Sequence, residues 1–243
     1  MGFIDMQNYK GKLAFIRIPK TGGQTMMDIL YQIFGFKNVL KIWGQQSDRE
    51  IGRFSVQDFL ELDSATIDTY PCMGGHITLD KVLTKIGHEN FKEKYSSYTI
   101  TRDPVDTVIS LYNYYRTNTD HTRHEAISKI GFGEFIQNEY SKNLQCKYLG
   151  STTAYDAIYN ASLFLNRIVT IGSFDHLVEE VSSLFLNSDQ GKIHRKVKNV
   201  SQKFVSRMSL SADLIDKIKQ DNYQDSLLFE AVGSHEEITR SFD

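Results

Sequence analysis

The sequence has little of what would mark a disulfide-rich, membrane-spanning or nucleic-acid-binding protein. Only two of its 243 residues are cysteines, Cys72 and Cys146, which is too few for a disulfide framework and fits a reducing compartment. Its 28 basic and 30 acidic residues give a net charge of −2, so the overall charge does not favour a nucleic-acid partner. No apolar run is long enough to cross a bilayer, so no membrane span is expected.

The sequence also shows no pattern typical of a targeting segment or a linker. The first residues, Met1 to Met6, lack the basic region and apolar run of a signal peptide, which favours a soluble, cytoplasmic protein. There is no internal repeat, low-complexity segment or linker rich in proline, glycine and serine. With 40% hydrophobic and 24% charged residues, the chain can bury one sizeable core. We therefore expect a single domain over residues 1–243.

Short β-favouring runs alternate with amphipathic helical segments along the chain. Strands are predicted at 13–16, 38–43, 95–102 and 168–171, and 72–76 is expected to be a short extended piece that ends at His76. Helices are predicted at 26–34, 55–62, 79–86, 104–115, 132–140, 143–149, 153–166, 174–186, 211–220 and 226–232. Ser55, Thr78 and Asp103 stand at helix N-cap positions, where their side chains suit the first N–H groups. The alternation predicts an α/β fold with a mostly parallel central sheet flanked by helices and a helical second half.

The segment from Arg17 to Thr25 is the most informative stretch of the sequence. It joins the strand predicted at 13–16 to the following helix, with Gly22 and Gly23 at the bend. Such a turn directs free backbone N–H groups and a helix N-terminus toward one point, which suits a phosphate or sulfate. Further charge and hydrogen-bonding groups come from Lys20, Thr21 and Thr25. An ordinary strand–helix connection is the alternative, and the ATPase loop pattern does not fit because Lys20 precedes the glycines.

This segment, Pro19-Lys20-Thr21-Gly22-Gly23, resembles the 5′-phosphosulfate loop of sulfotransferases that use 3′-phosphoadenosine 5′-phosphosulfate (PAPS). The preceding Arg17-x-Pro makes it most similar to the branch with the uronosyl 2-O-sulfotransferases and their bacterial relatives. The resemblance implies a P-loop-like fold, shared with nucleotide kinases, and PAPS as the sulfuryl donor. It places these residues at the donor: Arg17, Lys20, Thr21, Gly22, Gly23, Gln24 and Thr25. Gln24 stands where the family usually has Ser or Thr, although its amide can still donate.

A second motif, Arg102-Asp103-Pro104 with Ser110, follows the strand predicted at 95–102. Open α/β sheets bind ligands at the carboxyl ends of their strands, and an arginine fork matches two phosphate oxygens at once. In the family that this chain resembles, an Arg and a Ser in this arrangement hold the 3′-phosphate of PAPS. The alternative is an Arg102 paired with a carboxylate and a Ser110 that is an ordinary residue of a helix surface.

Gly75-His76 is the third feature that resembles the family, whose uronosyl branch uses a His at this place to remove the proton of the acceptor hydroxyl. Histidine suits this role because its pKa lies near neutrality. Gly74 and Gly75 let backbone approach closely, and we expect them to leave room for an acceptor. A structural or surface histidine is the alternative interpretation of His76.

Two later segments also resemble the family. The basic run 195–201 is similar to a segment that folds over the nucleotide, which implies Lys198 and Ser201 as further donor contacts. Such a run is also typical of a solvated loop. The stretch from Asn143-Leu144-Gln145 through Leu149-Gly150 also resembles a family segment, one that is structural or faces the acceptor.

Together these features predict a PAPS-dependent O-sulfotransferase in which Lys20 and the loop N–H groups stabilise the leaving oxygen and His76 is the base. No metal is expected, because no His, Cys or Asp cluster has the spacing of metal ligands. The acceptor is a carbohydrate or small molecule, with glycan, lipid-linked sugar, polyketide and alkaloid all open. A nucleotide-dependent small-molecule kinase and a nucleotide-binding module without chemistry are the alternatives.

Overall fold

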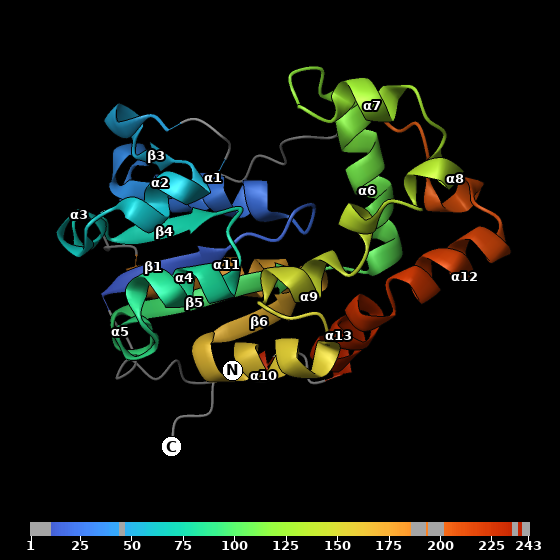
Figure 1. Cartoon of the computed structure of the whole chain (residues 1–243). Helices are drawn as coiled ribbons and strands as arrows, with labels where there is room; N and C mark the ends of the chain where they lie inside the picture. Colours follow the sequence, from blue (N-terminus) through green and yellow to red (C-terminus); the bar gives the residue numbers. More distant parts are fainter. Residues whose placement is uncertain (1–10, 44–46, 186–192, 194–201, 235–237, 240–243) are drawn as a thin grey trace.

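A seven-stranded sheet forms the centre of the molecule in the computed structural model, which describes residues 11–43, 47–185, 193, 202–234 and 238–239 (Figure 1). The strand order is β3-β2-β4-β1-β5-β6-β7. The strands are β1 Lys12–Ile16, β2 Val39–Ile42, β3 Arg53–Phe54, β4 Cys72–Gly75, β5 Tyr95–Thr101, β6 Arg167–Thr170 and β7 Ile238–Thr239. Only β7 pairs antiparallel among these strands. The prediction of a mostly parallel sheet flanked by helices is therefore confirmed.

The helices account for most of the chain after β5, as predicted. They are α1 Gly23–Phe34, α2 Val56–Glu61, α3 Ser64–Asp68, α4 Leu79–Ile86, α5 His88–Lys94, α6 Pro104–Thr117, α7 His124–Ser128, α8 Phe132–Phe135, α9 Leu144–Tyr148, α10 Ala154–Phe164, α11 Phe174–Phe185, α12 Ala212–Asp221 and α13 Tyr223–Ser234. Short 3₁₀ turns are η2 Phe36–Asn38, η3 Arg49–Ile51, η4 Glu139–Ser141, η5 Ile171–Ser173 and η6 Arg207–Ser209. The helix predicted at 132–140 is in fact α8 followed by η4.

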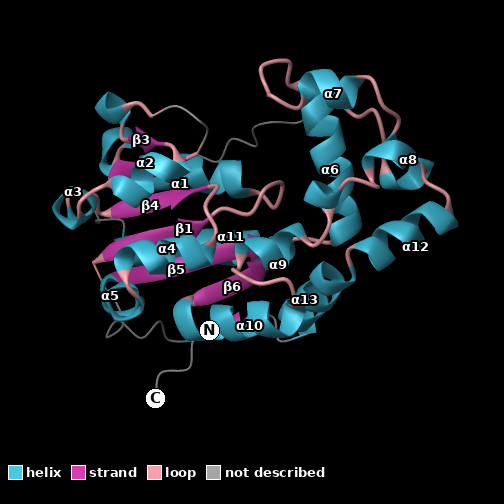
Figure 2. Cartoon of the chain, viewed as in Figure 1, coloured by secondary structure: helices cyan, strands magenta, loops and turns pink. Residues whose placement is uncertain are grey.

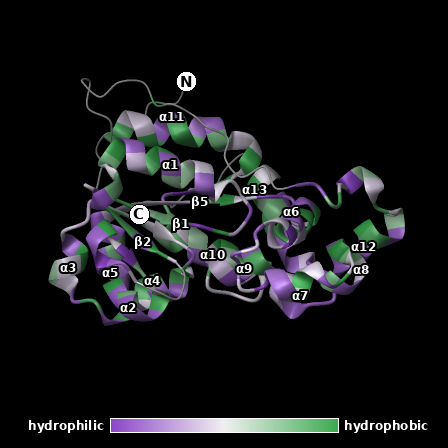
Figure 3. Cartoon of the chain, turned by 90° about the horizontal axis from the view of Figure 1, so that it is seen from above, coloured by the Kyte–Doolittle hydropathy of each residue, from purple (hydrophilic) through white to green (hydrophobic). Residues whose placement is uncertain are grey.

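Helices cover both faces of the sheet, as Figure 3 shows from above. In β1, Leu13 and Phe15 pack in one apolar cluster with α1 and α11. Ala14 and Ile16 belong to the opposite cluster, to which α2, α4, α5, α10 and α13 contribute. Alternate residues of a strand point to opposite faces, so this short run anchors both halves of the core.

A third apolar cluster joins α6, α7, α8 and α12 into a helical part of the molecule that lies beside the sheet (Figure 2). It begins where β5 ends, because Asp103 caps α6 by accepting from the Asp106 N–H at 3.0 Å and Pro104 occupies the first turn. The loop after β1 projects toward α6 (Figure 1). The carboxyl edge of the sheet thus faces this helical part.

Two of the three predicted N-caps are confirmed. The Ser55 hydroxyl accepts from the Asp58 N–H at 3.0 Å, and Asp103 caps α6. Thr78 holds the N-cap position of α4, but its side chain makes no capping hydrogen bond. Its hydroxyl is buried without a partner among the described residues, so the predicted Thr78 side-chain cap is wrong.

The double glycine at the end of β4 allows close packing inside the sheet. A Cβ on Gly75 would lie 2.0 Å from the backbone oxygen of Ile42 in β2, and one on Gly74 would lie 2.8 Å from the Met27 sulfur of α1. Strand β2 and helix α1 therefore fill the space that the missing side chains leave. The expectation that these glycines leave room for an acceptor is wrong.

Candidate functional site

The loop between β1 and α1 has an unusual backbone. Lys20 has φ 67° and Gly22 has φ 94°, both in the left-handed region that is uncommon for residues other than glycine. Gly22 is the N-cap of α1 and has no side chain with which to accept from the first N–H groups of the helix. The positive end of the α1 dipole is therefore available to an anion.

Arg17 packs across the start of α1. Its Nη2 donates to the Gln24 Oε1 at 3.0 Å, and its guanidinium carbon lies 5.6 Å from the centre of the Trp43 ring. A Cβ on Gly23 would lie 2.6 Å from the Arg17 Cγ, so a glycine is needed where the arginine crosses the helix. Burial lowers the pKa of Arg17, although a guanidinium remains charged at neutral pH.

The remaining side chains of the loop face inward to different extents. Thr21 is 0% exposed, and its hydroxyl donates to the Ile18 carbonyl at 3.0 Å, so this hydroxyl holds the loop together. The Gln24 side-chain amide donates one N–H to the Asp28 carboxylate at 3.2 Å, so its second N–H can donate to a ligand. Thr25 is half-buried on the first turn of α1. Contacts of Thr21, Gln24 and Thr25 with the donor stay predictions.

Lys20 lies among other cations. Its Nζ is 4.2 Å from the centre of the Tyr114 ring, on α6. Burial, together with the positive charges of Arg17 and Arg102, lowers the pKa of Lys20 to about 8. Three like charges on one loop and its neighbouring strand repel each other, and a polyanionic ligand would remove that repulsion. The charge pattern therefore favours an anion at this edge of the sheet.

Arg102 follows β5 and connects to the same loop. Its Nη1 donates to the Lys20 carbonyl at 3.1 Å, across 82 positions of sequence. Within the described ranges Arg102 forms no ion pair, whereas the neighbouring Asp103 pairs with Arg207 at 2.9 Å. The alternative of an Arg102 paired with a carboxylate is therefore not observed. Ser110 is half-buried on α6, two turns after its N-cap.

His76 follows β4 and contacts the loop from the other side. Its Nδ1 lies 3.1 Å from the Arg17 carbonyl oxygen. Because a carbonyl only accepts, Nδ1 carries the proton and Nε2 keeps a free lone pair. Burial and the nearby charge of Arg17 lower the pKa of His76 to about 3, so the ring is neutral at physiological pH. The edge-on Tyr148 ring lies 6.3 Å away, centre to centre.

Four predicted residues therefore meet at the carboxyl edge of β1, β4 and β5: Arg17, Lys20, His76 and Arg102. Lys198 and Ser201 lie outside the described residues. Tyr114 and Tyr148 were not predicted, because aromatic residues on helices carry no local signal for a site. Gln145 bonds to the Arg102 backbone, and Asp225 accepts from the backbone of Gln145 and Cys146, as described below. Of these two, only Gln145 lies in a segment that resembles the family.

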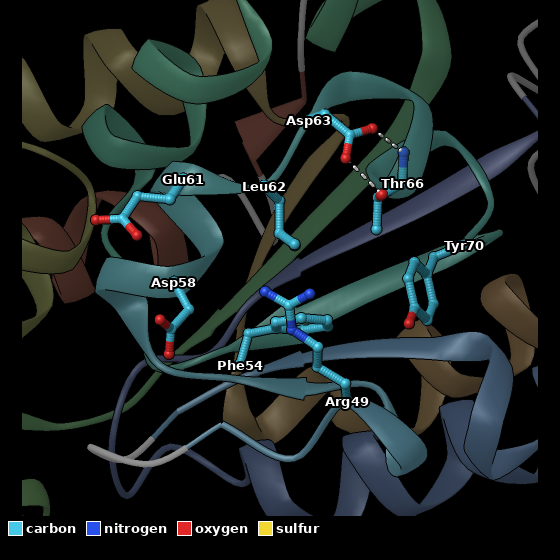
Figure 4. Close-up of a pocket in the computed structure, with 8 residues that line it drawn as sticks. All are labelled: Arg49, Phe54, Asp58, Glu61, Leu62, Asp63, Thr66 and Tyr70. Atoms are coloured by element: carbon cyan, nitrogen blue, oxygen red, sulfur yellow. Dashed lines mark hydrogen bonds between the residues drawn. The ribbon is translucent and has the colours of Figure 1, made fainter.

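A polar hollow of about 230 Å³ lies elsewhere, between η3, β3, α2 and α3 (Figure 4). The Arg49 side chain lies in this hollow, but two carboxylates that line it, those of Asp58 and Asp63, already accept hydrogen bonds from other residues. Asp58 accepts from the hydroxyls of Ser47 and Ser55, and Asp63 accepts from the backbone and hydroxyl of Thr66. This hollow is explained by helix capping, and we assign it no ligand.

Comparison with known proteins identifies the family. The model of the sulfotransferase family matches residues 4–230. The chain belongs to the sulfotransferase family. This confirms the family to which its motifs pointed. Among solved structures, this family member is similar to the crystal structure of mouse sulfotransferase SULT7A1 complexed with PAP, with 16% identity and a TM-score of 0.45. The match covers 74% of this chain and 61% of the mouse chain. Comparison with curated proteins gave no significant match.

Two further observations concern membranes and metals. In the described part of this sulfotransferase-family chain, no helix is both long and apolar enough to cross a membrane. Over the same residues, no group of three or more His, Cys, Asp and Glu side chains is arranged to hold a metal ion.

Proposed function

We propose that this protein transfers a sulfuryl group from PAPS to a hydroxyl group of a carbohydrate or small-molecule acceptor. The observation that carries the proposal is the uncapped start of α1 with Lys20, Arg17 and Arg102 around it, in a member of the sulfotransferase family. PAPS has an anionic group at each end of its nucleotide. The α1 terminus and Lys20 suit the phosphosulfate, while Arg102 and Ser110 suit the 3′-phosphate.

The proposed reaction is an in-line displacement at sulfur. The acceptor oxygen forms a bond to sulfur while the bond from sulfur to the bridging oxygen breaks, and that oxygen leaves with the nucleotide phosphate. Lys20 and the first N–H groups of α1 stabilise the charge that grows on the leaving oxygen. The acceptor proton goes to the free Nε2 of His76, whose Nδ1 is held by the Arg17 carbonyl. Lys198 and Ser201 are proposed as additional contacts to the nucleotide.

The direct test is nucleotide selectivity. We expect 3′-phosphoadenosine 5′-phosphate (PAP) to stabilise the folded protein by about 2.7 kcal/mol at a hundred times its dissociation constant, while ATP with magnesium stabilises it much less. Thermal unfolding with each nucleotide measures this, and transfer of labelled sulfur from PAPS to a panel of hydroxyl acceptors follows. Equal stabilisation by PAP and ATP would contradict the proposal and favour a nucleotide kinase. Binding of PAP with no transfer to any acceptor would favour a module without chemistry.

Arg102→Ala should weaken PAP binding by about 1.5–3 kcal/mol, the range for a hydrogen bond to a charged group. The loss should be smaller for adenosine 5′-phosphate (AMP), which differs from PAP only in the 3′-phosphate. Calorimetry with both nucleotides measures the difference, and Arg49→Ala, at the far edge of the sheet, is the control. Any loss common to both nucleotides reports the missing bond to the Lys20 carbonyl. Equal losses for PAP and AMP would mean that Arg102 does not contact the 3′-phosphate.

A further inference from the structure

The backbone of Arg102 is held on both sides by one side chain. The Arg102 N–H donates to the Gln145 Oε1 at 2.9 Å, and the Arg102 carbonyl accepts from the Gln145 Nε2 at 2.7 Å. A primary amide has both an acceptor and a donor, so it pairs with a residue as a neighbouring strand would. Gln145 is 0% exposed, which excludes direct contact with a nucleotide. Its effect on ligand binding must pass through Arg102.

Gln145 is itself fixed by a second buried group. It lies in the first turn of α9, where the N–H groups of Gln145 and Cys146 each donate to one carboxylate oxygen of Asp225 at 2.9 Å. Asp225 is 2% exposed and lies at the start of α13. In return, Asn143 accepts from the Gln224 N–H at 3.0 Å and from the Asp225 N–H at 3.2 Å. The two helices therefore cap each other and fix where the Gln145 amide lies.

The same contacts reach the loop after β1. Gln145 holds the Arg102 backbone, and the guanidinium of the same arginine donates to the Lys20 carbonyl at 3.1 Å. Lys20 has a left-handed φ of 67°, a conformation that surrounding structure must maintain. A shift of the Arg102 backbone would therefore displace its guanidinium and loosen the Lys20 peptide at once.

We propose that Gln145 is a positioning residue for recognition of the nucleotide 3′-phosphate, and that Asp225 holds Gln145 in place for this role. The inference rests on the proposed function, because it assigns the 3′-phosphate to Arg102. It explains why a buried glutamine and a buried aspartate from two helices converge behind an arginine at the edge of the sheet. Discrimination between PAP and AMP is thus set partly by residues that touch neither nucleotide.

Two substitutions of Gln145 separate positioning from stability. Gln145→Leu removes both bonds to Arg102, whereas Gln145→Glu keeps the acceptor for the Arg102 N–H and places an oxygen against its carbonyl. Asn166→Leu is the matched control. The Asn166 side chain accepts from the Ser97 N–H at 2.9 Å, so it holds the opposite end of the same strand, β5. All three variants should lower the unfolding temperature, because each leaves buried backbone groups unpaired.

Calorimetry with PAP and AMP on the chain of residues 1–243 is the deciding measurement. We expect Gln145→Leu to lower the ratio of PAP to AMP affinity about tenfold, Gln145→Glu to lower it less, and Asn166→Leu to leave it unchanged. A ratio that stays at the wild-type value in a folded Gln145 variant would overturn the positioning role and leave the proposed function standing. A wild-type protein that binds PAP and AMP equally would remove the 3′-phosphate assignment, and this inference with it. If Gln145→Leu fails to fold, Gln145→Glu decides.

Discussion

His76→Ala is expected to lower the rate of sulfuryl transfer by about 10²–10⁴, the usual contribution of a positioned general base, and to leave PAP affinity nearly unchanged. An acceptor hydroxyl is a poor nucleophile until its proton is removed. In the structure the Nδ1–H of His76 is committed to the Arg17 carbonyl at 3.1 Å, so the neutral ring offers Nε2 as a proton acceptor. Lys20, another titratable group whose charge acts on His76, is needed as a cation.

The experiment pairs the transfer rate with PAP affinity in wild type and variant. His124→Ala is a matched control, because the Nδ1 of His124 also lies against a backbone carbonyl, that of Tyr115, at 2.9 Å. Turnover near the wild-type rate in His76→Ala would refute its role as base. Loss of PAP binding together with turnover would indicate instead that His76 holds the Arg17 segment of the loop.

The pH dependence gives an independent check on the same residue. Burial lowers the pKa of His76 to about 3, and the charges of Arg17 and Lys20 contribute. A bound nucleotide offsets those two charges, so the pKa of His76 should rise when the donor binds. Turnover with saturating donor should therefore fall as the pH drops through this raised pKa, because protonated Nε2 cannot act as base. The acid limb should be absent from the residual activity of His76→Ala.

The sequence was sufficient where the signal is local. Asp103-Pro104 marks a helix start in any context, and it is where α6 begins. Lys20 follows a predicted strand, Arg102 ends another, and His76 ends a predicted extended piece. Because the carboxyl ends of parallel strands meet at one edge, the proximity of these residues followed from the fold class. The short helices α3 and α5 were not predicted, because five or seven residues show little helical periodicity.

What could not be predicted depends on contacts between distant residues. Gln145 meets Arg102 across 43 positions of sequence, and Asp225 meets Gln145 across 80. Nothing near either residue indicates which backbone it will hold. Strand β7, two residues long, forms through its pairing with β6. The same limit applies to Gly74 and Gly75. Their sequence predicted that other backbone approaches them closely, but only the structure shows that the approaching elements are β2 and α1.

Lys20→Met is the second substitution from which a large effect is expected. Methionine keeps an unbranched side chain against the Tyr114 ring, whose centre lies 4.2 Å from the Lys20 Nζ. The substitution also removes the positive charge of Lys20. The leaving oxygen carries more charge in the transition state than in bound PAPS, and only this difference accelerates the reaction. We expect the turnover number to fall by about 10²–10³, the cost of losing one such donor, and PAPS affinity to fall less. Lys129→Met, which removes an exposed lysine paired with Glu125, is the control.

The charge state of Lys20 supplies the decisive readout. Burial and the charges of Arg17 and Arg102 lower its pKa to about 8 in the protein without ligand. Since the protonated amine is the active form, kcat/KM for PAPS should fall as the pH rises above about 8 in the wild type. Bound PAPS stabilises the ammonium, so the fall in kcat should begin at higher pH. This fall in activity at high pH should be absent in Lys20→Met. If PAPS affinity falls as much as turnover in Lys20→Met, Lys20 anchors the donor in the ground state and the leaving oxygen is stabilised by the α1 terminus alone.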